Sequence, residues 1–596
     1  MDKRRLLVSG ALLFAVLIAY SNSLTGEFIF DDSGAVIGNP YISRIWPIQD
    51  AFKAPRRTTN SGRPIACFSL ALNYQLAGYN VAGYRAFNIA THMACALLLF
   101  GLVRRSIKTI YPDENSHAAL YIAAITTAFW ALHPVNTVLV NYVAQRCELL
   151  SNFFILLTLY FSLRGFQSAE RKTTWYVAAG FACVFGVGSK EVAVVTPILV
   201  LLFERAFFRR TFLTALRHSW PLYAGFLVAW LFGAWLVSAG GTAEGASSTQ
   251  VKWGPWIYLL SQAESILTYL KLIFVPVSLC FDYGAPAASG LSAVWLAFFV
   301  VSILGILSFI LNITQPVAGF CLAWFFLILA PSSSVIPLPD ITVEYRMTLA
   351  MAGIIALCVG LGARFAANRI PTGALTGLVG LVCVLLLIGT FLRNRDYHSA
   401  LAIWSDAAQK KPGNARAFAN AGVALAQTGD LAGAEKVLRR AVAIEPDLPS
   451  VQMNFAAFLA MQGKVREALP YFIRAVEITP ESAQAAFNLG NAYSDLGQSN
   501  LAVAVYQKAI ALDPGFHDAY LNLGIELFGR REYAAALDSI QAANQIIPNH
   551  SNAHLMRGRV LLALNKKDAA RQAFQTALQC DPKNRLAAQE LQRLNP

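Results

Sequence analysis

Two adjacent carboxylates stand near the start of the chain, where Asp31 and Asp32 occur in the stretch Phe-Ile-Phe-Asp-Asp-Ser-Gly over residues 28–34. Neighbouring carboxylates beside a membrane surface have two common uses: one ionises as a base while the other binds, or both hold a cation. The same residues also suit a solvated turn, because Asp, Ser and Gly are turn formers. The pair alone leaves these alternatives open.

The chain that must position this pair is too apolar for an ordinary soluble protein. Of its 596 residues, 56% are hydrophobic and only 14% are charged, whereas charged residues make up roughly 25% of soluble proteins. The charge-poor part is the first two thirds. This composition excludes a soluble enzyme, a disordered chain and a collagen-like fibre, and it predicts a polytopic membrane domain followed by a soluble domain.

Net charge and cysteine content exclude two further classes. Most of the net charge of +14 lies in the apolar two thirds, where inward-facing loops are expected to be rich in Lys and Arg. We therefore predict no nucleic-acid partner. The nine cysteines are scattered, mostly inside apolar runs and without a C-x-x-C pair, so they indicate neither a zinc site nor a disulfide framework.

Eleven apolar runs predict eleven helical membrane spans. The first run follows three basic residues and lacks a cleavage site, so we expect an uncleaved span with its N-terminus inside. The stretch over residues 256–280 would be a twelfth span, but it carries two charges and a glutamine, and we expect it to form a helix in the membrane interface. The eleven runs cover residues 6–20, 86–103, 118–140, 149–163, 174–188, 192–203, 219–238, 291–311, 316–331, 347–363 and 373–392.

An odd number of spans places the C-terminal part of the chain on the outer side and keeps the basic loops on the same side as the N-terminus, as the positive-inside rule requires. One run is too short to span, since residues 192–203 give about 18 Å of helix against a hydrocarbon core of about 30 Å. Either the helix is broken there, or Lys190 and Glu191 lie at membrane depth. Both interpretations make this pair a candidate site, because ionisable groups inside a membrane usually mark a pathway or a site.

A repeat with a period of 34 residues organises the C-terminal third, where prolines recur at positions 412, 446, 480, 514, 548 and 582. Small residues recur where paired helices would cross, at 422, 456, 490, 524 and 558 and at 434, 468, 502, 536 and 570. This is the tetratricopeptide pattern. The sequence thus predicts an all-α protein with a membrane domain over 1–392, a connecting half-repeat over 393–411, and five repeats over 412–596 closed by a capping helix over 583–594.

An asparagine recurs two positions before the small residue of the first helix in four repeats, as Asn420, Asn454, Asn488 and Asn522, and Met556 replaces it in the fifth. This position resembles the one that lines the concave groove of tetratricopeptide superhelices such as that of O-GlcNAc transferase. Carboxamides suit binding of an acceptor peptide, because each offers a donor and an acceptor to its backbone. The alternative is that asparagine is simply common there in the repeat.

Several short motifs accompany the carboxylate pair in both halves of the membrane domain. In chain order they are Asp31-Asp32, Gly38-Asn-Pro, Ser61-Gly-Arg63-Pro64, Leu132-His133-Pro134, Arg146-Cys-Glu148, Ser189-Lys190-Glu191 and Glu344-Tyr345-Arg346. Together with the repeats, this order resembles the transmembrane and tetratricopeptide-repeat (TMTC) O-mannosyltransferase family and its bacterial relatives. The resemblance implies a glycosyltransferase of the C fold (GT-C), with a lipid-phosphate-linked monosaccharide as donor and an acidic motif in the first outer loop.

The resemblance also implies roles for these residues. The related protein O-mannosyltransferases have Asp-Glu where this chain has Asp-Asp, which leaves Asp31 as the catalytic base and Asp32 as its support. The leaving group is a lipid phosphate that gathers negative charge, and Arg and Lys suit such a group. We expect two or three of five cations to bind it: Arg63, Arg85, Arg146, Lys190 and Arg346. Supporting residues would be His133, Glu148, Glu191 and Glu344. No metal ligands are assigned, and a divalent metal stays open.

Each of these residues also has a structural interpretation. Arg85 could be an anchor at the start of the second span. His133, which precedes a proline at a span end, is more readily a hydrogen-bonding structural residue than an acid or ligand. The charged residues could pair locally, as Arg146 with Glu148, Lys190 with Glu191, and Glu344 with Arg346.

The leading functional hypothesis is transfer of a monosaccharide from a polyprenyl-phosphate donor to Ser/Thr hydroxyls of exported proteins, with the repeats binding the acceptor polypeptide. A second enzyme hypothesis is an oligosaccharide ligase or lipid-modifying sugar transferase of the same fold. The non-enzymatic alternative is a membrane-anchored scaffold for envelope or secretion assembly. In each case we expect a bacterial inner-membrane protein whose active site and repeats face the periplasm.

Overall fold

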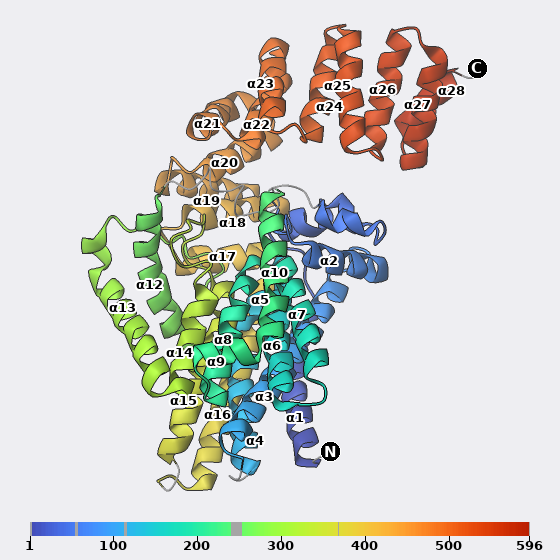
Figure 1. Cartoon of the computed structure of the whole chain (residues 1–596). Helices are drawn as coiled ribbons and strands as arrows, with labels where there is room; N and C mark the ends of the chain where they lie inside the picture. The colour runs from blue at the N-terminus through green and yellow to red at the C-terminus, as the bar shows by residue number, and fades with distance from the viewer. Residues whose placement is uncertain (1–2, 54–57, 113–115, 240–252, 367–368, 595–596) are drawn as a thin grey trace. The chain divides into compact units, whose positions relative to one another are not determined.

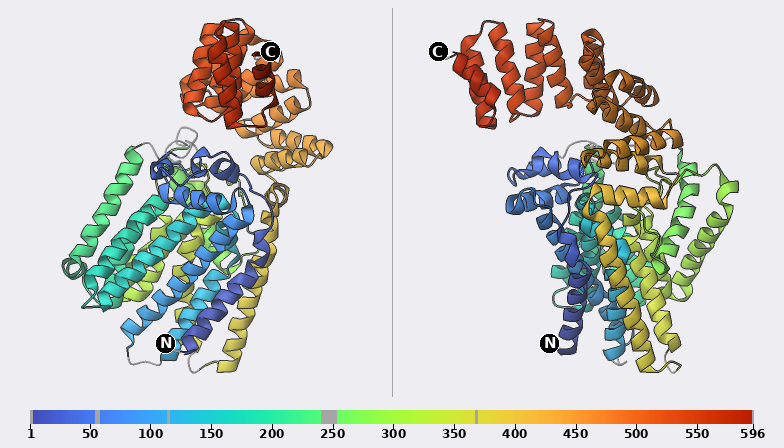
Figure 2. Two further views of the ribbon diagram at one scale, coloured as in Figure 1. Left: turned by 90° about the vertical axis from the view of Figure 1, so that its right-hand side faces the viewer. Right: turned by 180° about the vertical axis from the view of Figure 1, so that it is seen from behind.

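The computed structural model describes residues 3–53, 58–112, 116–239, 253–366 and 369–594. The chain forms two compact units, Met1–Lys411 and Pro412–Pro596. The described residues form helices and turns, and none of them lies in a β-strand (Figures 1 and 2). The all-α fold class predicted from the sequence is therefore confirmed.

Each of the eleven apolar runs of the first unit contributes a helix, but the run over 118–140 is interrupted after Ala131 and the run over 192–203 begins in the 3-10 turn η7 (Glu191–Val195). The helices are α1 (Lys3–Ala19), α3 (Val81–Ile110), α4 (Ser116–Ala131), α6 (Arg146–Gln167), α7 (Lys172–Ser189), α8 (Thr196–Phe208), α10 (Trp220–Ser238), α13 (Leu291–Thr314), α14 (Pro316–Leu329), α15 (Met347–Ala366) and α16 (Thr372–Asn394). Among the described residues six helices are long and apolar enough to cross a membrane, or seven if two helices bent by 51° count as one span. The count of eleven is not confirmed, because helices such as α8 and α14 have only 13 and 14 residues.

The core of the first unit is built around α6, which packs against α3 and α7. Of the most apolar stretch of α6, 61% is buried inside the protein, against 11% for α13 and 6% for α16. These two outer helices therefore expose apolar faces of the kind that lipid covers. Figure 2 shows α16 at the edge of the bundle.

The segment for which an interfacial helix was predicted forms α12 (Pro255–Phe274). This helix contacts α13 and α15 and runs alongside α13 in Figure 1. Ten of its twenty residues are buried, and Gln262 donates a hydrogen bond to the carbonyl of Ile341 at 3.0 Å. The polar residues of α12 thus pack within the unit, and its position relative to the membrane stays a prediction.

Basic segments gather at one end of the first unit. Arg4 hydrogen-bonds the ring of His117 at 3.0 Å, so the N-terminus lies beside the start of α4. Arg105 near the end of α3 donates to Gln167 at the end of α6. The positive-inside rule predicts that such loops share one side of a membrane, and the side on which they lie stays a prediction.

The second unit consists of five pairs of antiparallel helices and a final helix. The pairs are α18 (Ala415–Gln427) with α19 (Leu431–Ile444), α20 (Pro449–Met461) with α21 (Val465–Ile478), α22 (Ala483–Asp495) with α23 (Ser499–Leu512), α24 (His517–Gly529) with α25 (Tyr533–Ile546), and α26 (Ser551–Ala563) with α27 (Lys567–Cys580); α28 (Arg585–Leu594) follows. The predicted crossing residues are small for a packing reason: a Cβ on Gly490 would lie 2.6 Å from the ring of Tyr506. The predicted crossing alanine in the second helix of each pair, such as Ala434, is fully buried.

The connecting segment over 393–411 belongs to the first unit. It contains the 3-10 turn η10 (Arg395–His398) and the helix α17 (Ala400–Lys410). The sequence predicted a half-repeat here, and α17 is a single helix with its apolar side buried.

Candidate active site

The two carboxylates of the first loop have different environments. Asp32 is fully buried, and its two oxygens accept hydrogen bonds from the backbone N–H of Ala144 at 2.6 Å and of Ile29 at 3.1 Å. Burial raises the pKa of Asp32 to about 7, although these N–H groups and the nearby Arg85 oppose the shift. Asp32 therefore fixes the loop to the turn η6 (Val143–Gln145). Because both its oxygens are used, the pair does not offer two carboxylates to a cation.

Asp31 is half-buried, and its carboxylate accepts a hydrogen bond from the hydroxyl of Thr59 at 3.3 Å. Tyr142 lies close enough to both aspartates for their charges to act on its hydroxyl. Among the two carboxylates, only Asp31 keeps access to solvent. This is the geometry that a base for an incoming hydroxyl needs.

Arg63 is connected to the Asp31 carboxylate through Thr59, which contacts both residues. One of its terminal nitrogens donates to the carbonyl of Thr59 at 2.8 Å. Its other nitrogens make a two-pronged pair with Glu191, at 2.6 Å from Nη2 to Oε1 and 3.2 Å from Nε to Oε2. Thr59 thus connects the arginine to Asp31, although Asp31 and Arg63 are 32 positions apart in the sequence.

Lys190 is buried and forms an ion pair with buried Glu148, with 2.8 Å between Nζ and Oε2. Its ammonium also lies 4.5 Å from the centre of the Tyr345 ring. The predicted local pairs Lys190 with Glu191 and Arg146 with Glu148 are wrong. The backbone of Lys190 is extended between α7 and the turn η7 (Glu191–Val195), so consecutive side chains point in opposite directions.

Two predicted phosphate ligands have structural roles instead. Arg85 is fully buried and donates to four backbone carbonyls, those of Ser23, Thr25, Glu27 and Tyr397, at 2.7–3.1 Å. Arg146 is 1% exposed and donates to Asn88, Asn73, Ser69 and Tyr84. A guanidinium has five N–H groups, and each of these residues makes four donor contacts within the protein, so the contacts do not support a phosphate role for either. Arg85 is also not an exposed anchor.

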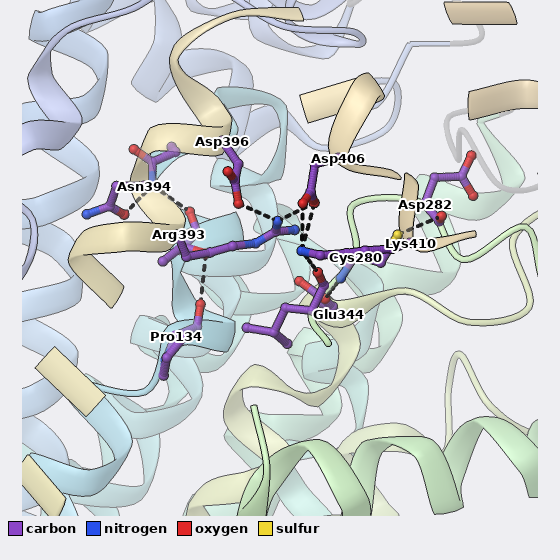
Figure 3. A network of polar contacts seen from close by, with 12 residues as sticks. Pro134, Cys280, Asp282, Glu344, Arg393, Asn394, Asp396, Asp406 and Lys410 are labelled. Carbon is purple, nitrogen blue, oxygen red and sulfur yellow. Dashed lines mark hydrogen bonds and ion pairs between the residues drawn. The ribbon is translucent and has the colours of Figure 1, made fainter. Parts of the chain in front are cut away.

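Arg346 and Glu344 do not pair with each other. Arg346 donates to the carbonyls of Asp340 and Ile341, at 2.8 and 3.1 Å, and so holds the preceding loop. Glu344 accepts from the N–H of Cys280 at 2.5 Å (Figure 3). It also accepts from the hydroxyl of Tyr283 at 3.0 Å. The phosphate role of Arg346 is therefore not supported by its contacts.

His133 is buried, with Nε2 3.2 Å from the carbonyl of Ile273 and Nδ1 3.3 Å from the N–H of Val135. A neutral ring that is protonated at Nε2 makes both bonds at once. The structural interpretation of His133 thus fits its contacts.

The structure therefore brings together Asp31, Asp32, Arg63, Lys190, Glu148 and Glu191 around Thr59, Tyr142 and Tyr345. Sequence reasoning missed the last three residues. Tyr345 stands inside a motif that was singled out for its charges, and Thr59 precedes another. Tyr142 carried no signal, since a tyrosine beside an apolar run is also a common membrane-interface residue. No group of three or more His, Cys, Asp or Glu side chains is arranged to hold a metal ion in the part of the chain that the structure describes.

The four asparagines of the repeats are half-buried, but they do not form one continuous row of hydrogen bonds. Asn454 donates to Asn420 at 3.2 Å. Asn488 accepts from Gln484 in its own helix, and Asn522 donates to Asn491 of the preceding repeat. Each keeps polar atoms for other partners, so peptide binding there stays a prediction.

Comparison with known proteins adds to this geometry. Two tetratricopeptide repeat models match the chain, one at residues 447–514 and the other at 386–449, 488–549 and 521–585. The protein O-mannosyl-transferase F38B6.6 of Caenorhabditis elegans is 24% identical over 461 residues, which are 73% of this chain and 62% of that protein. The chain is related to TMTC-type protein O-mannosyltransferases. The mouse relative TMTC4 is 25% identical over 209 residues, 32% of this chain and 28% of that protein.

The chain thus spans about 62% of the nematode relative and 28% of mouse TMTC4. Two of the solved structures that resemble it match about a third of its length. The match to the MamA crystal structure covers 29% of this chain and 94% of the MamA chain, with 23% identity and a TM-score of 0.27. The match to Pseudomonas aeruginosa pilF covers 35% of this chain and 93% of the pilF chain, with 22% identity and a TM-score of 0.30. The TMTC relatives and the apolar helices together indicate an integral membrane protein.

Proposed function

We propose that this chain is a GT-C-type membrane glycosyltransferase that moves one sugar from a polyprenyl-phosphate donor to Ser/Thr hydroxyls of exported proteins. The names of its TMTC relatives favour mannose as the sugar. One observation carries the proposal: Asp31 is solvent-accessible and is connected through Thr59 to Arg63 and its ion pair with Glu191, whereas the adjacent Asp32 is fully buried.

The proposed reaction is a direct displacement. The acceptor oxygen attacks the anomeric carbon and forms the new C–O bond, while the bond from that carbon to the phosphate oxygen breaks and its electron pair goes to the lipid phosphate. Asp31 accepts the hydroxyl proton, for which its carboxylate must come within roughly 3 Å of the acceptor oxygen. Attack opposite the leaving group inverts the anomeric centre.

Two cations would stabilise the leaving phosphate in this proposal. An ammonium has three N–H donors, and the ion pair of Lys190 with Glu148 uses one of them. Arg63 is only 4% exposed and also donates to protein groups, but its partner Glu191 has a side chain that is 31% exposed, so this pair, unlike Arg85 and Arg146, reaches the solvent-accessible edge of the site. We propose that these two residues bind the phosphate, with Glu148 and Glu191 orienting them.

The repeats would supply the acceptor. A groove that holds an extended polypeptide raises the local concentration of its hydroxyls without selecting one sequence. Asn420, Asn454, Asn488 and Asn522 are the proposed contacts with the peptide backbone. We further propose that the site and repeats face the periplasm of a bacterium, across the inner membrane from the basic loops.

Transfer can be measured with the full chain in lipid nanodiscs that contain polyprenyl-phosphate mannose, with a Ser/Thr-rich peptide as acceptor and mass spectrometry as readout. Asp31→Asn should lower the rate by about 100- to 10,000-fold, the usual contribution of a general base. Asp50→Asn is the matched control, because Asp50 lies in the same loop but pairs with Arg44 and Lys53.

Unchanged transfer in Asp31→Asn would refute the proposed role of this carboxylate. If the wild type transfers nothing to the peptide, and only replacement of the groove asparagines abolishes the cellular phenotype, the chain is a scaffold. A product that carries a lipid or an oligosaccharide would favour the second enzyme hypothesis.

A further inference from the structure

The segment after the last apolar helix is bound to the loop that carries Asp31. The N–H of Glu27 donates to the carbonyl of His398 at 3.1 Å. The carboxylate of Glu27 in turn accepts from the N–H of Ala400, the first residue of α17, at 2.6 Å. Gly26 is required at this contact, because its φ is +122° and a Cβ would lie 2.8 Å from the carbonyl oxygen of His398. Loop and helix start are thus in direct backbone contact.

The middle of α17 packs against the residue that precedes Asp31. Trp404 is 3% exposed, and its ring meets the ring of Phe30 edge-on, with 5.1 Å between centroids. Phe30 has a φ of +48°, a conformation that a residue other than glycine keeps only when its surroundings hold it. Because Phe30 and Asp31 share a peptide bond, the contact with Trp404 supports the backbone directly next to the carboxylate.

Trp404 also contacts Phe281 at 5.1 Å, and Phe281 contacts the ring of Tyr142 at 5.2 Å. Tyr142 is the residue whose hydroxyl lies within the electrostatic reach of both aspartates. Trp404 therefore contacts one neighbour of Asp31, Phe30, directly and a second neighbour, Tyr142, through Phe281.

The end of α17 holds the other side of the site through ion pairs (Figure 3). Asp406 accepts from Arg393 and from Lys410, each at 2.7 Å. Lys410 also donates to the carbonyl of Leu279 at 2.7 Å. The next residue along this loop, Cys280, donates its N–H to Glu344. Glu344 directly precedes Tyr345, whose ring lies 4.5 Å from the ammonium of Lys190.

We propose that α17 is a positioning element of the active site and that Trp404 is a positioning residue for Asp31. This inference rests on the function proposed above. It assigns a role in positioning the active site to α17, which also connects the last apolar helix to the repeats. Trp404 touches neither donor nor acceptor, so its replacement should slow the reaction without weakening acceptor binding.

The experiment compares Trp404→Ala, Trp404→Phe and Phe30→Ala in full-length protein in nanodiscs, with Gln409→Ala on the exposed side of α17 as control. Trp404→Ala and Phe30→Ala should lower kcat by about 100-fold, the effect of misplacing a reacting group by about 1 Å, with KM for the peptide unchanged. Trp404→Phe keeps an aromatic ring and should restore most of kcat. Phe30 is 42% exposed, so Phe30→Ala should fold even if Trp404→Ala does not.

A second readout does not depend on catalysis. Hydrogen–deuterium exchange should show faster exchange at the amides of Asp32 and Ser33, which bond to the carbonyls of Ile29 and Phe30, in Trp404→Ala but not in Gln409→Ala. If the wild type transfers no sugar but this exchange rises, the contact stands and the proposed reaction falls. If kcat in both alanine variants matches the wild type, or exchange is unchanged in Trp404→Ala, the inference is overturned.

Discussion

Replacing Arg85 by lysine should destabilise the first unit even though the positive charge is kept. The guanidinium of Arg85 donates to four carbonyls, of which those of Ser23 and Tyr397 are bonded in fully buried positions. A buried acceptor that loses its partner costs about 1–3 kcal/mol. Arg85→Ala should therefore cost about 2–6 kcal/mol, since the two part-buried carbonyls can find water. Arg85→Lys should lose about half of this, because one ammonium cannot reach carbonyls from separate segments.

The assay is the free energy of unfolding of the full chain, measured by denaturant titration in mixed micelles and followed by tryptophan fluorescence. Arg217→Ala is a matched control, since Arg217 is an exposed arginine of the same unit. If Arg85 were a phosphate ligand, lysine would preserve stability and a defect would appear only in the KM for the lipid donor. Wild-type stability in both Arg85 variants would refute the reasoning from its carbonyl contacts.

Three further predictions concern packing, charge and pH. Gly490→Ala should destabilise the repeats by about 1 kcal/mol, because the strain against Tyr506, about 2 kcal/mol, exceeds the gain of about 1 kcal/mol in helix propensity; thermal unfolding will measure it. Lys190→Met should cost about 3–5 kcal/mol of unfolding free energy by leaving Glu148 unpaired, and adding Glu148→Gln should recover most of it. Burial lowers the pKa of His550 below its ordinary 6.5 in the folded protein. As the pH falls below 6.5, the unfolded chain therefore binds a proton before the folded protein does. The free energy of unfolding should be constant above pH 6.5 and fall below it, by up to about 1.4 kcal/mol per pH unit. His550→Asn, which keeps a capping side chain, should reduce this slope in pH-dependent exchange at the start of α26. The titratable groups that face His550 are His517, Asp518 and His554.

Each of these predictions has a control and a contrary outcome. Gly413→Ala should be neutral, because nothing lies within 4 Å of its added Cβ; equal losses at both glycines would contradict the packing argument. For the buried pair, a double variant as unstable as Lys190→Met would show that the two charges do not depend on each other. An unchanged pH slope in His550→Asn would assign the slope to the neighbouring groups.

The repeats could be predicted well from the sequence because their cause is local. A period of 34 residues fixes where helix pairs cross, and the crossing points accept only small side chains, as the distance from Gly490 to Tyr506 shows. The break between α7 and α8 was also predictable, since a run of twelve residues cannot span a membrane. The structure places the break at Lys190 and Glu191, between Ser189 and Thr196.

The partners of the site residues could not be predicted, because they come from distant segments. Glu191 pairs with Arg63, which lies 128 positions away, and no local pattern specifies that contact. Burial was equally hidden. Arg85 and Arg146 were predicted to bind the donor phosphate, yet Arg85 donates to backbone carbonyls and Arg146 to carbonyls and amide side chains inside the unit. The predicted number of spans is not confirmed for another reason, since α8 and α14 are apolar but short.

The boundary between the two units falls after Lys411, nineteen residues beyond the end of the last apolar run at Leu392. A chimera that grafts foreign repeats directly behind residue 392 would delete Trp404 and Lys410 along with the native repeats. Loss of turnover in such a fusion would then be misread as a failure to recruit substrate. A splice placed after Lys411 keeps these contacts, so exchange of repeats at that junction can test recruitment separately from chemistry.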